Sequence, residues 1–210
     1  MTRDQISTFF ARLAATNPAP KTELAYRDPY TLLVAVVLSA QATDVGVNKA
    51  TERLFRLANT PATMIELGEA RLRDVIKTIG LYRNKAKNVI ALSKTLVDQH
   101  GGEVPKTRAA LEELPGVGRK TASVVLNEAF GEPTIAVDTH VFRVANRTGL
   151  APGKTPLVVE HALEAKVPPH YAKGAHHWLI LHGRYVCTAR KPKCADCVVR
   201  QLCAYDAKRV

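Results

Sequence analysis

The stretch LPGVGRKTA, Leu114–Ala122, decides the fold because it joins two helical patterns through a very short turn. The pattern predicts one helix over Arg108–Leu114 and a second over Arg119–Phe130, and the glycines of PGVG allow a sharp backbone path between them. Backbone N–H groups in such a turn, at the start of a helix, form a concavity that binds a phosphate. An ordinary helical hairpin, whose proline and glycines only turn the chain, is the alternative. The candidate phosphate-binding residues are Gly116, Gly118 and Arg119.

A lysine occupies the start of the second hairpin helix. The aligned peptide dipoles place partial positive charge there, so Lys120 is poorly placed to stabilise its own helix. The same position, together with partial burial, disfavours the protonated amine and therefore favours a nucleophile. A surface lysine that reaches a phosphate is the alternative interpretation.

Helical periodicity continues along the rest of the chain, and alternating strand-like runs are scarce. We therefore predict an all-α protein with short connections. Outside the hairpin, the expected helices cover residues 6–14, 31–41, 45–57, 72–79, 85–99, 141–148, 157–165 and 176–185. An extended stretch, GEPTIAVD, separates two helical blocks. We expect a domain at 22–132, which contains the hairpin at about 108–130, and a second domain formed by 1–21 with 133–210.

The chain is strongly basic. Its 30 lysines and arginines against 19 acidic residues give a formal charge of +11. Such a balance is typical of proteins that bind a polyanion, above all nucleic acid, although a merely solvated surface is the alternative. The longest apolar run, Leu32–Leu38, is far shorter than the ~18 residues of a membrane span. The N-terminal MTRDQISTFF lacks the apolar core of a signal peptide. We expect a cytoplasmic protein with no membrane partner.

All four cysteines lie near the C-terminus in a C-x6-C-x2-C-x5-C pattern, which favours a metal site over disulfides. They are Cys187, Cys194, Cys197 and Cys203. Only one pair has the spacing of a zinc knuckle, and thiolate-only ligation also suits a [4Fe-4S] cluster, so the spacing leaves both open. Three cations follow the first cysteine, Arg190, Lys191 and Lys193. A loop that is held at both ends by a metal and carries three cations is suited to gripping phosphates.

The stretch VDTHVFRVANR, Val137–Arg147, supplies a carboxylate. Asp138 caps a helix in the simpler interpretation. In the functional one it faces Lys120, and such a pair can displace a group from a sugar carbon. The amine attacks, and the carboxylate stabilises positive charge on the sugar ring.

Two further stretches contain candidate contacts. GLYRNKAKN, Gly80–Asn88, places Leu81 and Tyr82 at the tip of a turn, followed by Arg83, Lys85 and Lys87. Exposed apolar groups beside cations can wedge between stacked bases, although a lone leucine more often packs into the core. In LSAQATD, Leu38–Asp44, the polar Gln41 ends an apolar helix and has no necessary task there.

Taken together, these motifs resemble the endonuclease III family of DNA base-excision glycosylases, within the helix-hairpin-helix superfamily, in their order and spacing. The resemblance implies that Lys120 attacks the sugar C1′ of a flipped-out nucleotide, expels the base and forms a Schiff base before β-elimination. It implies that Asp138 assists, that Gln41 and Leu81 enter the duplex, and that the four cysteines hold a [4Fe-4S] cluster. It also assigns DNA contacts to the basic loop after Cys187. We place Arg143 among the DNA-contacting residues as well.

The branch within the superfamily follows from two features. Adenine-specific mismatch glycosylases lack a lysine in the Lys120 role and usually carry a further C-terminal domain, whereas this chain has the lysine and ends seven residues after Cys203. We therefore expect a monomeric, bacterial-type enzyme that removes oxidised pyrimidines from double-stranded DNA, cleaves abasic sites and associates with the nucleoid through DNA. Its site would lie in the cleft between the two domains. The alternatives are a monofunctional mismatch glycosylase and a non-catalytic Fe-S DNA-binding module.

Overall fold

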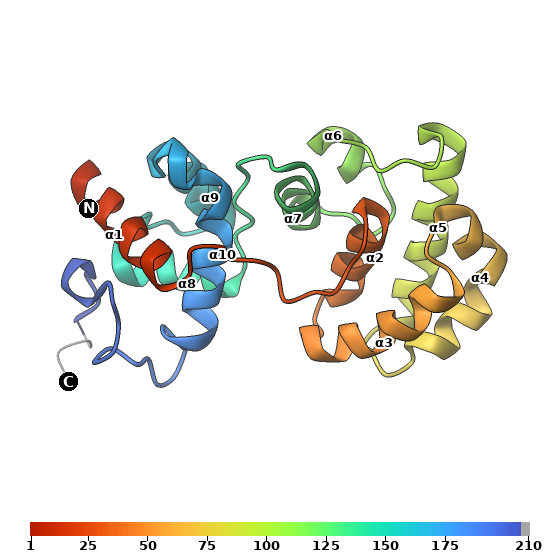
Figure 1. Ribbon diagram of the computed structural model, residues 1–210, viewed down its shortest axis with the longest axis horizontal. Coiled ribbons are helices and arrows are strands. Elements are labelled where there is room, and N and C mark those ends of the chain that lie inside the picture. The colour runs from red at the N-terminus through yellow and green to blue at the C-terminus, as the bar shows by residue number, and fades with distance from the viewer. Residues whose placement is uncertain (207–210) are drawn as a thin grey trace. The chain divides into compact units, whose positions relative to one another are not determined.

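The computed structural model describes residues 1–206, and its regular structure in that range is entirely helical (Figure 1). The prediction of an all-α protein is confirmed for these residues. The helices are α1 (Arg3–Thr16), α2 (Pro29–Ser39), α3 (Asp44–Leu57), α4 (Pro61–Ile76), α5 (Tyr82–His100), α6 (Arg108–Glu112), α7 (Arg119–Phe130), α8 (Thr139–Thr148), α9 (Pro156–Lys166), α10 (Pro169–Tyr185) and the 3-10 turn η1 (Arg200–Leu202).

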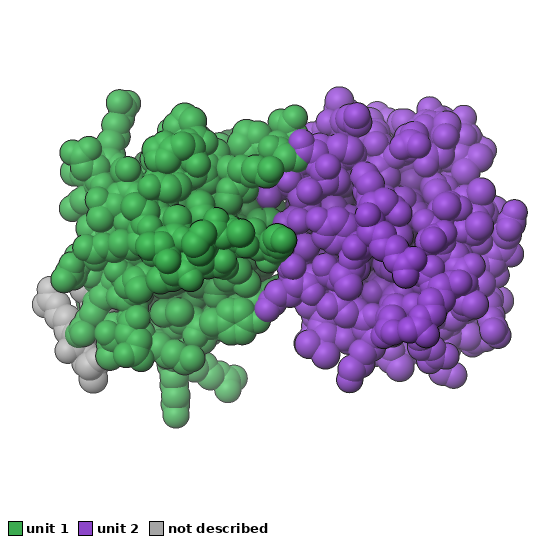
Figure 2. All heavy atoms as spheres, viewed as in Figure 1, with its two compact units in different colours: residues 1–21, 131–210 green, residues 22–130 purple. Residues whose placement is uncertain are grey.

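The chain divides into two compact units (Figure 2). One comprises residues 22–130 and contains α2–α7, whereas residues 1–21 and those from 131 onward form the other, with α1 and α8–α10. Each unit has its own cluster of buried apolar side chains. Residues 207–210, the end of the second predicted domain, lie outside the described residues.

Helix α2 forms the centre of the unit at 22–130. Nine of its eleven residues are buried, and it packs against α3, α5 and α7. A helix that is apolar on all sides is stable only inside a protein, which explains this placement. The helix starts at a capping box: Asp28 Oδ1 accepts a hydrogen bond from the Thr31 N–H at 2.8 Å, with Pro29 in the first turn.

Several predicted helix boundaries were wrong. Helix α4 begins at Pro61 rather than at 72, because Thr60 caps it and a proline fits the first helical position. It bends at Gly68, where φ is +74°. Helix α10 likewise begins at Pro169 rather than at 176, and α2 ends at Ser39, before the predicted end at 41. These starts were missed because they are signalled by capping residues and proline, not by apolar periodicity.

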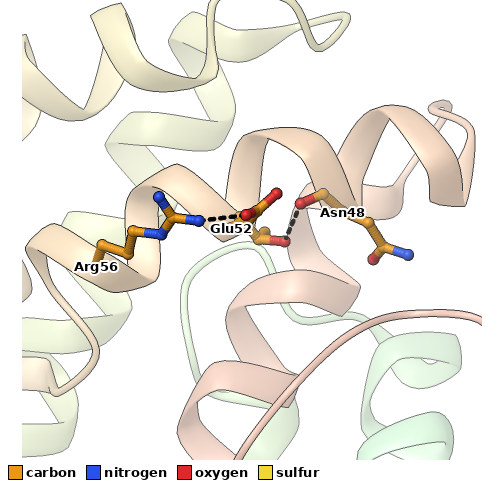
Figure 3. A network of polar contacts seen from close by, with 4 residues as sticks. Asn48, Glu52 and Arg56 are labelled. Atoms are coloured by element: carbon orange, nitrogen blue, oxygen red, sulfur yellow. Dashed lines mark hydrogen bonds and ion pairs between the residues drawn. The ribbon is translucent and has the colours of Figure 1, made fainter.

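Helix α3 carries a row of polar side chains at four-residue spacing, Asn48, Glu52 and Arg56 (Figure 3). Arg56 and Glu52 form an ion pair one turn apart on its exposed face (Figure 3). Exposed pairs of this kind contribute about 0.3–0.5 kcal/mol. Asn48 is more consequential, because its side chain accepts from the Ala25 N–H at 2.9 Å and donates to the Glu23 carbonyl at 2.8 Å. The segment that enters the unit is thereby fixed.

In the other unit, α10 packs against both α1 and α8. Gly183 makes the α8 contact close, since a Cβ there would lie 2.8 Å from His140 Cβ. Phe10, Tyr171 and Trp178 form an aromatic cluster, and Trp178 Nε1 donates to the Asn17 carbonyl at 2.8 Å. Among the described residues, no helix is long and apolar enough to cross a membrane.

Candidate functional site

The hairpin of α6 and α7 is built by local contacts. Thr107 Oγ1 caps α6 by accepting from the Ala110 N–H at 3.3 Å. The Val117 N–H donates to the Leu114 carbonyl at 3.0 Å, and both of these side chains are buried. The glycines between and after them are exposed. The turn is therefore anchored from inside and presents its backbone to solvent, as a phosphate-binding turn requires.

Gly116 is the residue on which this turn depends. Its φ of +79° lies in the left-handed region, which favours glycine. A Cβ at Gly116 would also lie 2.7 Å from Asn88 Nδ2 and 2.8 Å from Asn88 Cβ. The turn thus lies directly against α5. Asn88 is a part of the site that sequence reasoning missed, because nothing local marks it. Gly118, by contrast, has open space where a Cβ would be.

Lys120 lies in the first turn of α7, and its side chain is exposed, like that of Arg119. The expected partial burial of Lys120 was therefore wrong. Burial depends on what packs around a helix start, and here the hairpin projects the first turn of α7 into solvent. Any desolvation of this amine has to come from a bound partner.

Gln41 and Leu81 are exceptional in backbone conformation. Among the described residues they are the two non-glycine residues with positive φ, at +54° and +59°. Both are exposed, Leu81 by 55%. The two turns are neighbours, because a Cβ on Gly80 would lie 3.8 Å from the Gln41 carbonyl oxygen. The core alternative for Leu81 was wrong, and such strained residues cluster at functional sites.

Lys85 differs from the two cations near it. It is 5% exposed, whereas Arg83 and Lys87 face solvent. Its Nζ has no hydrogen-bond partner among the described residues, and burial lowers the pKa of this lysine. The expectation of three cations beside Leu81 was therefore wrong for Lys85, whose side chain turns inward.

Asp138 caps α8, as its simpler interpretation predicted. Its Oδ1 accepts from the His140 and Val141 N–H groups, each at 2.8 Å. Oδ2 accepts no hydrogen bond from the described residues, and the side chain is half-buried. The cap fixes one oxygen and leaves the other for a partner. Asp138 and Lys120 belong to different units.

The four cysteines lie together around one cavity. Among the described residues these four cysteines form no disulfide, and they line the cavity with Val186, Pro192 and Tyr205. Arg200 and Lys193 also line it, and cations there offset the negative charge of a thiolate-ligated centre. In the described residues no three His, Cys, Asp or Glu side chains are arranged to hold a single metal ion. Four thiols spread around a cavity suit a polynuclear iron–sulfur cluster.

The three loop cations are exposed, as expected for a phosphate-contacting loop. Arg143 is half-buried, and its guanidinium donates to the Cys187 carbonyl at 2.9 Å and to the Gly183 carbonyl at 2.8 Å. These bonds tie α8 to the end of α10 and to the first cysteine. Arg143 therefore has a structural task beyond the DNA contact that we expected of it.

Comparison with known proteins decides the family. A family model described as "HhH-GPD superfamily base excision DNA repair protein" matches residues 34–169, and another, "Iron-sulfur binding domain of endonuclease III", matches residues 187–203. Endonuclease III of Escherichia coli (strain K12) is 60% identical over 197 residues, which cover 94% of this chain and 93% of that protein. The chain belongs to the endonuclease III family. The resemblance drawn from the motifs is confirmed, and so is the [4Fe-4S] cluster as the cofactor that the four cysteines fit.

Solved structures agree over the whole chain. A trapped endonuclease III–DNA covalent intermediate has a TM-score of 0.92 and 46% identity, covering 100% of this chain and 99% of that one. A thermostable thymine-DNA glycosylase has a TM-score of 0.87 at 27% identity, covering 98% of each chain. The helical fold is therefore shared by an endonuclease III and a thymine-DNA glycosylase.

Proposed function

We propose that this chain excises oxidised pyrimidines from double-stranded DNA and then cleaves the abasic site, with Lys120 as the nucleophile. Base-excision repair by a bifunctional glycosylase and lyase is the activity of the family to which the chain belongs. One observation supports the role of Lys120 most directly: an exposed lysine stands in the first turn of α7, immediately after an exposed glycine turn. A relative with 46% identity has been trapped in a covalent complex with DNA.

The chemistry begins when DNA binding removes water from Lys120, which favours its neutral amine. Nζ attacks C1′ of the damaged nucleotide, and the bond between C1′ and the base breaks. The base leaves with the bonding electrons and takes up a proton. The sugar ring then opens, which yields a Schiff base between C1′ and Nζ. Loss of a C2′ proton expels the 3′ phosphate by β-elimination, and water releases the lysine.

Asp138 supports this reaction with its charge. The carboxylate stabilises positive charge that develops on the sugar and accepts the proton that Nζ loses. Because the cap engages Oδ1, Oδ2 is the oxygen available for these tasks. The capping bonds also hold the carboxylate in one orientation, which reduces the reorganisation that the reaction requires.

The DNA contacts are distributed over both units. In the unit at 22–130, the amides of Gly116 and Gly118 with Arg119 hold a phosphate, while Leu81 and Gln41 enter the stack where the nucleotide leaves. Flipping a nucleotide costs a few kcal/mol, which such contacts have to offset. In the other unit the cations Arg190, Lys191 and Lys193 bind the DNA backbone. Arg143 joins these DNA contacts and also holds the Cys187 carbonyl, just before this loop. The four cysteines would hold the cluster, which would cross-link the chain on both sides of this loop.

We further propose that the two compact units are the helix-hairpin-helix domain and the cluster domain, and that the protein acts as a monomer on chromosomal DNA in the cytoplasm. The strong positive charge supports association with DNA. A light-scattering measurement of mass with and without a short duplex tests the monomer.

Borohydride trapping tests the reaction. Purified protein, a duplex with one oxidised pyrimidine and borohydride should give a covalent adduct, because borohydride reduces a Schiff base. Lys120→Ala should abolish both the adduct and strand cleavage. The matched control is Lys94→Ala, which removes another exposed lysine of the same unit. Base release without an adduct would identify a monofunctional glycosylase instead, and DNA binding without base release would identify a non-catalytic module.

Asp138→Asn separates the carboxylate charge from the cap, because an asparagine oxygen can accept both capping bonds. We expect base excision to slow by about 10²–10⁴-fold at unchanged stability. An unchanged single-turnover rate would exclude the proposed role.

A further inference from the structure

Arg147, near the end of α8, contacts several parts of its unit and has no part in the reaction above. Its Nη1 lies 3.8 Å from Cys187 Sγ and donates to the Thr188 carbonyl at 2.7 Å. Its Nη2 donates to the Ala189 carbonyl at 2.8 Å. The guanidinium carbon also lies 4.6 Å from the ring centre of Tyr205. One side chain therefore joins a cluster ligand, the first two residues of the basic loop and an aromatic ring beyond the last cysteine.

The backbone of Arg147 reaches the other end of the cysteine segment. Its carbonyl oxygen lies 3.7 Å from Cys203 Sγ, and the next carbonyl, of Thr148, accepts from the Ala204 N–H at 3.1 Å. Cys187 and Cys203 are the first and last of the four ligands in sequence. The C-terminal end of α8 thus contacts both ends of the segment that holds the cluster.

Other hydrogen bonds in the loop of residues 188–193, which carries the cations, are local. Within it, Thr188 Oγ1 donates to the Lys191 carbonyl at 2.6 Å, and near its end the Lys193 N–H donates to the Val186 carbonyl at 2.9 Å. Both bonds are local and leave the start of the loop unattached to a helix. Ordering the backbone of a loop residue has a cost in conformational entropy. Two charge-assisted bonds to consecutive carbonyls offset much of that cost where the loop begins.

We propose that Arg147 is a positioning residue that orders the basic loop for DNA binding and couples this order to the cluster through Cys187. The inference rests on the proposed function, in which the loop cations contact DNA. A guanidinium suits the task because its planar fork donates in several fixed directions, whereas an ammonium is a point charge. A cation and an N–H group close to a ligand sulfur also stabilise the more negative, reduced state of a cluster.

The contacts of Arg143 distinguish the two arginines. Arg143 donates to carbonyls at Cys187 and Gly183, which belong to the end of α10 and the first ligand. In the part of the chain that the structure describes, Arg143 donates to neither Thr188 nor Ala189, whereas Arg147 donates to the carbonyls of both. Arg143 therefore fixes the first ligand, and Arg147 fixes the loop that follows.

The test compares Arg147→Met and Arg147→Lys with a matched control, Arg12→Met. Arg12 lies in the same unit and donates to the Val198 carbonyl at 3.0 Å and to Gln201 at 3.2 Å. It contacts the cysteine segment without touching the loop after Cys187. All three variants keep the four cysteines, so each should be purified with a full cluster. Iron content and visible absorbance are measured first to verify this.

Three measurements follow. Amide hydrogen exchange over residues 188–193, without DNA, should accelerate at least tenfold in Arg147→Met and only partly recover in Arg147→Lys. The salt dependence of affinity for an abasic-site analogue should flatten by about 2 to 3 in log–log slope, as expected when three phosphate contacts are lost, with a roughly tenfold or greater loss of affinity at 0.1 M salt. The reduction potential of the cluster should fall. Arg12→Met should match the wild type in all three.

Unchanged exchange in the loop of Arg147→Met would overturn the proposal, and so would the same changes in Arg12→Met, which would reveal general loosening of the unit. Failure of the proposed function has a different signature. In that case a variant with Arg190, Lys191 and Lys193 all replaced by alanine would keep wild-type affinity and salt slope, while Arg147→Met would still accelerate exchange in the loop.

Discussion

Replacing Gly116 by alanine should damage the hairpin far more than the same change at Gly118, two residues later. Gly116 has a φ of +79°, and an alanine in this left-handed region costs about 1–2 kcal/mol. The added methyl would also lie 2.8 Å from Asn88 Cβ. That atom is attached directly to the backbone of α5, so rotation of the Asn88 side chain cannot relieve the contact. The hairpin or α5 has to move, and overpacking of this kind costs about 1–3 kcal/mol.

The two costs together predict that Gly116→Ala lowers the free energy of unfolding by about 2–5 kcal/mol. At Gly118 the same methyl enters open space, and no positive φ is required there. Gly118→Ala should therefore change stability by less than about 0.5 kcal/mol. Both variants lose one glycine from the unfolded chain, so this entropic effect cancels in the comparison.

Urea denaturation followed by far-UV circular dichroism measures the difference, with both proteins carrying a full cluster. Asn88→Gly provides a further control, since it removes the Cβ that the new methyl would strike. Combined with Gly116→Ala, it should recover about 1 kcal/mol or more relative to the sum of the single changes. Equal stability of Gly116→Ala and Gly118→Ala would refute the reasoning, and absence of coupling to Asn88 would refute its steric part.

Other predictions test buried polar and close-packed sites in both units. Lys85→Met should stabilise the protein by about 1 kcal/mol at neutral pH, because it removes a buried amine without a hydrogen-bond partner. Since the pKa of Lys85 is lowered in the folded state, the unfolded chain binds more protons as the pH approaches the ordinary lysine value. Wild-type stability relative to Lys85→Met should therefore rise as the pH increases toward the ordinary lysine pKa of about 10.4, and a constant difference would contradict this. Gly183→Ala should lower the free energy of unfolding, measured by urea denaturation, by about 2 kcal/mol. The added methyl would lie 2.8 Å from His140 Cβ and 3.1 Å from the His140 carbonyl oxygen. A neutral effect would argue against the close contact of α8 and α10. Tyr30→Phe should cost about 1 kcal/mol, since the hydroxyl donates to Ser93 Oγ at 2.7 Å in the core, and the Ser93→Ala variant should remove most of this difference.

Helices with local start signals and strong periodicity could be predicted from the sequence. The hairpin helix α7 has the predicted bounds, and α8 begins where Asp138 caps it. The starts of α4 and α10 were missed, because proline at the first helical position follows a capping rule that apolar periodicity does not contain. The candidate site residues could also be found from the sequence, because a lysine after a glycine turn and four clustered cysteines are local patterns.

Burial and backbone strain could not be predicted locally. The sequence offers no reason why Lys85 turns inward while Arg83 and Lys87 remain exposed, or why Lys120 is exposed instead of partly buried. Nor does it show that Asn88 lies against the hairpin or that Arg147 reaches a sulfur and two carbonyls. These facts arise from elements that are distant in sequence and meet only in the folded units.

Gln41 and Leu81 show how a local backbone conformation can depend on packing elsewhere in the unit. Each of these residues adopts a left-handed backbone that costs on the order of 1 kcal/mol. Gln41 does so within a turn that the Ala42 N–H closes by donating to the Ser39 carbonyl at 3.0 Å. The cost is offset elsewhere: Gln41 follows α2, the most buried helix of its unit, and Leu81 begins α5, which packs against α2. Two well-packed helices thus hold two exposed side chains in conformations that an isolated peptide would leave. Glycine at either position should relieve the strain, and under the proposed function it would also remove a side chain that enters the DNA stack.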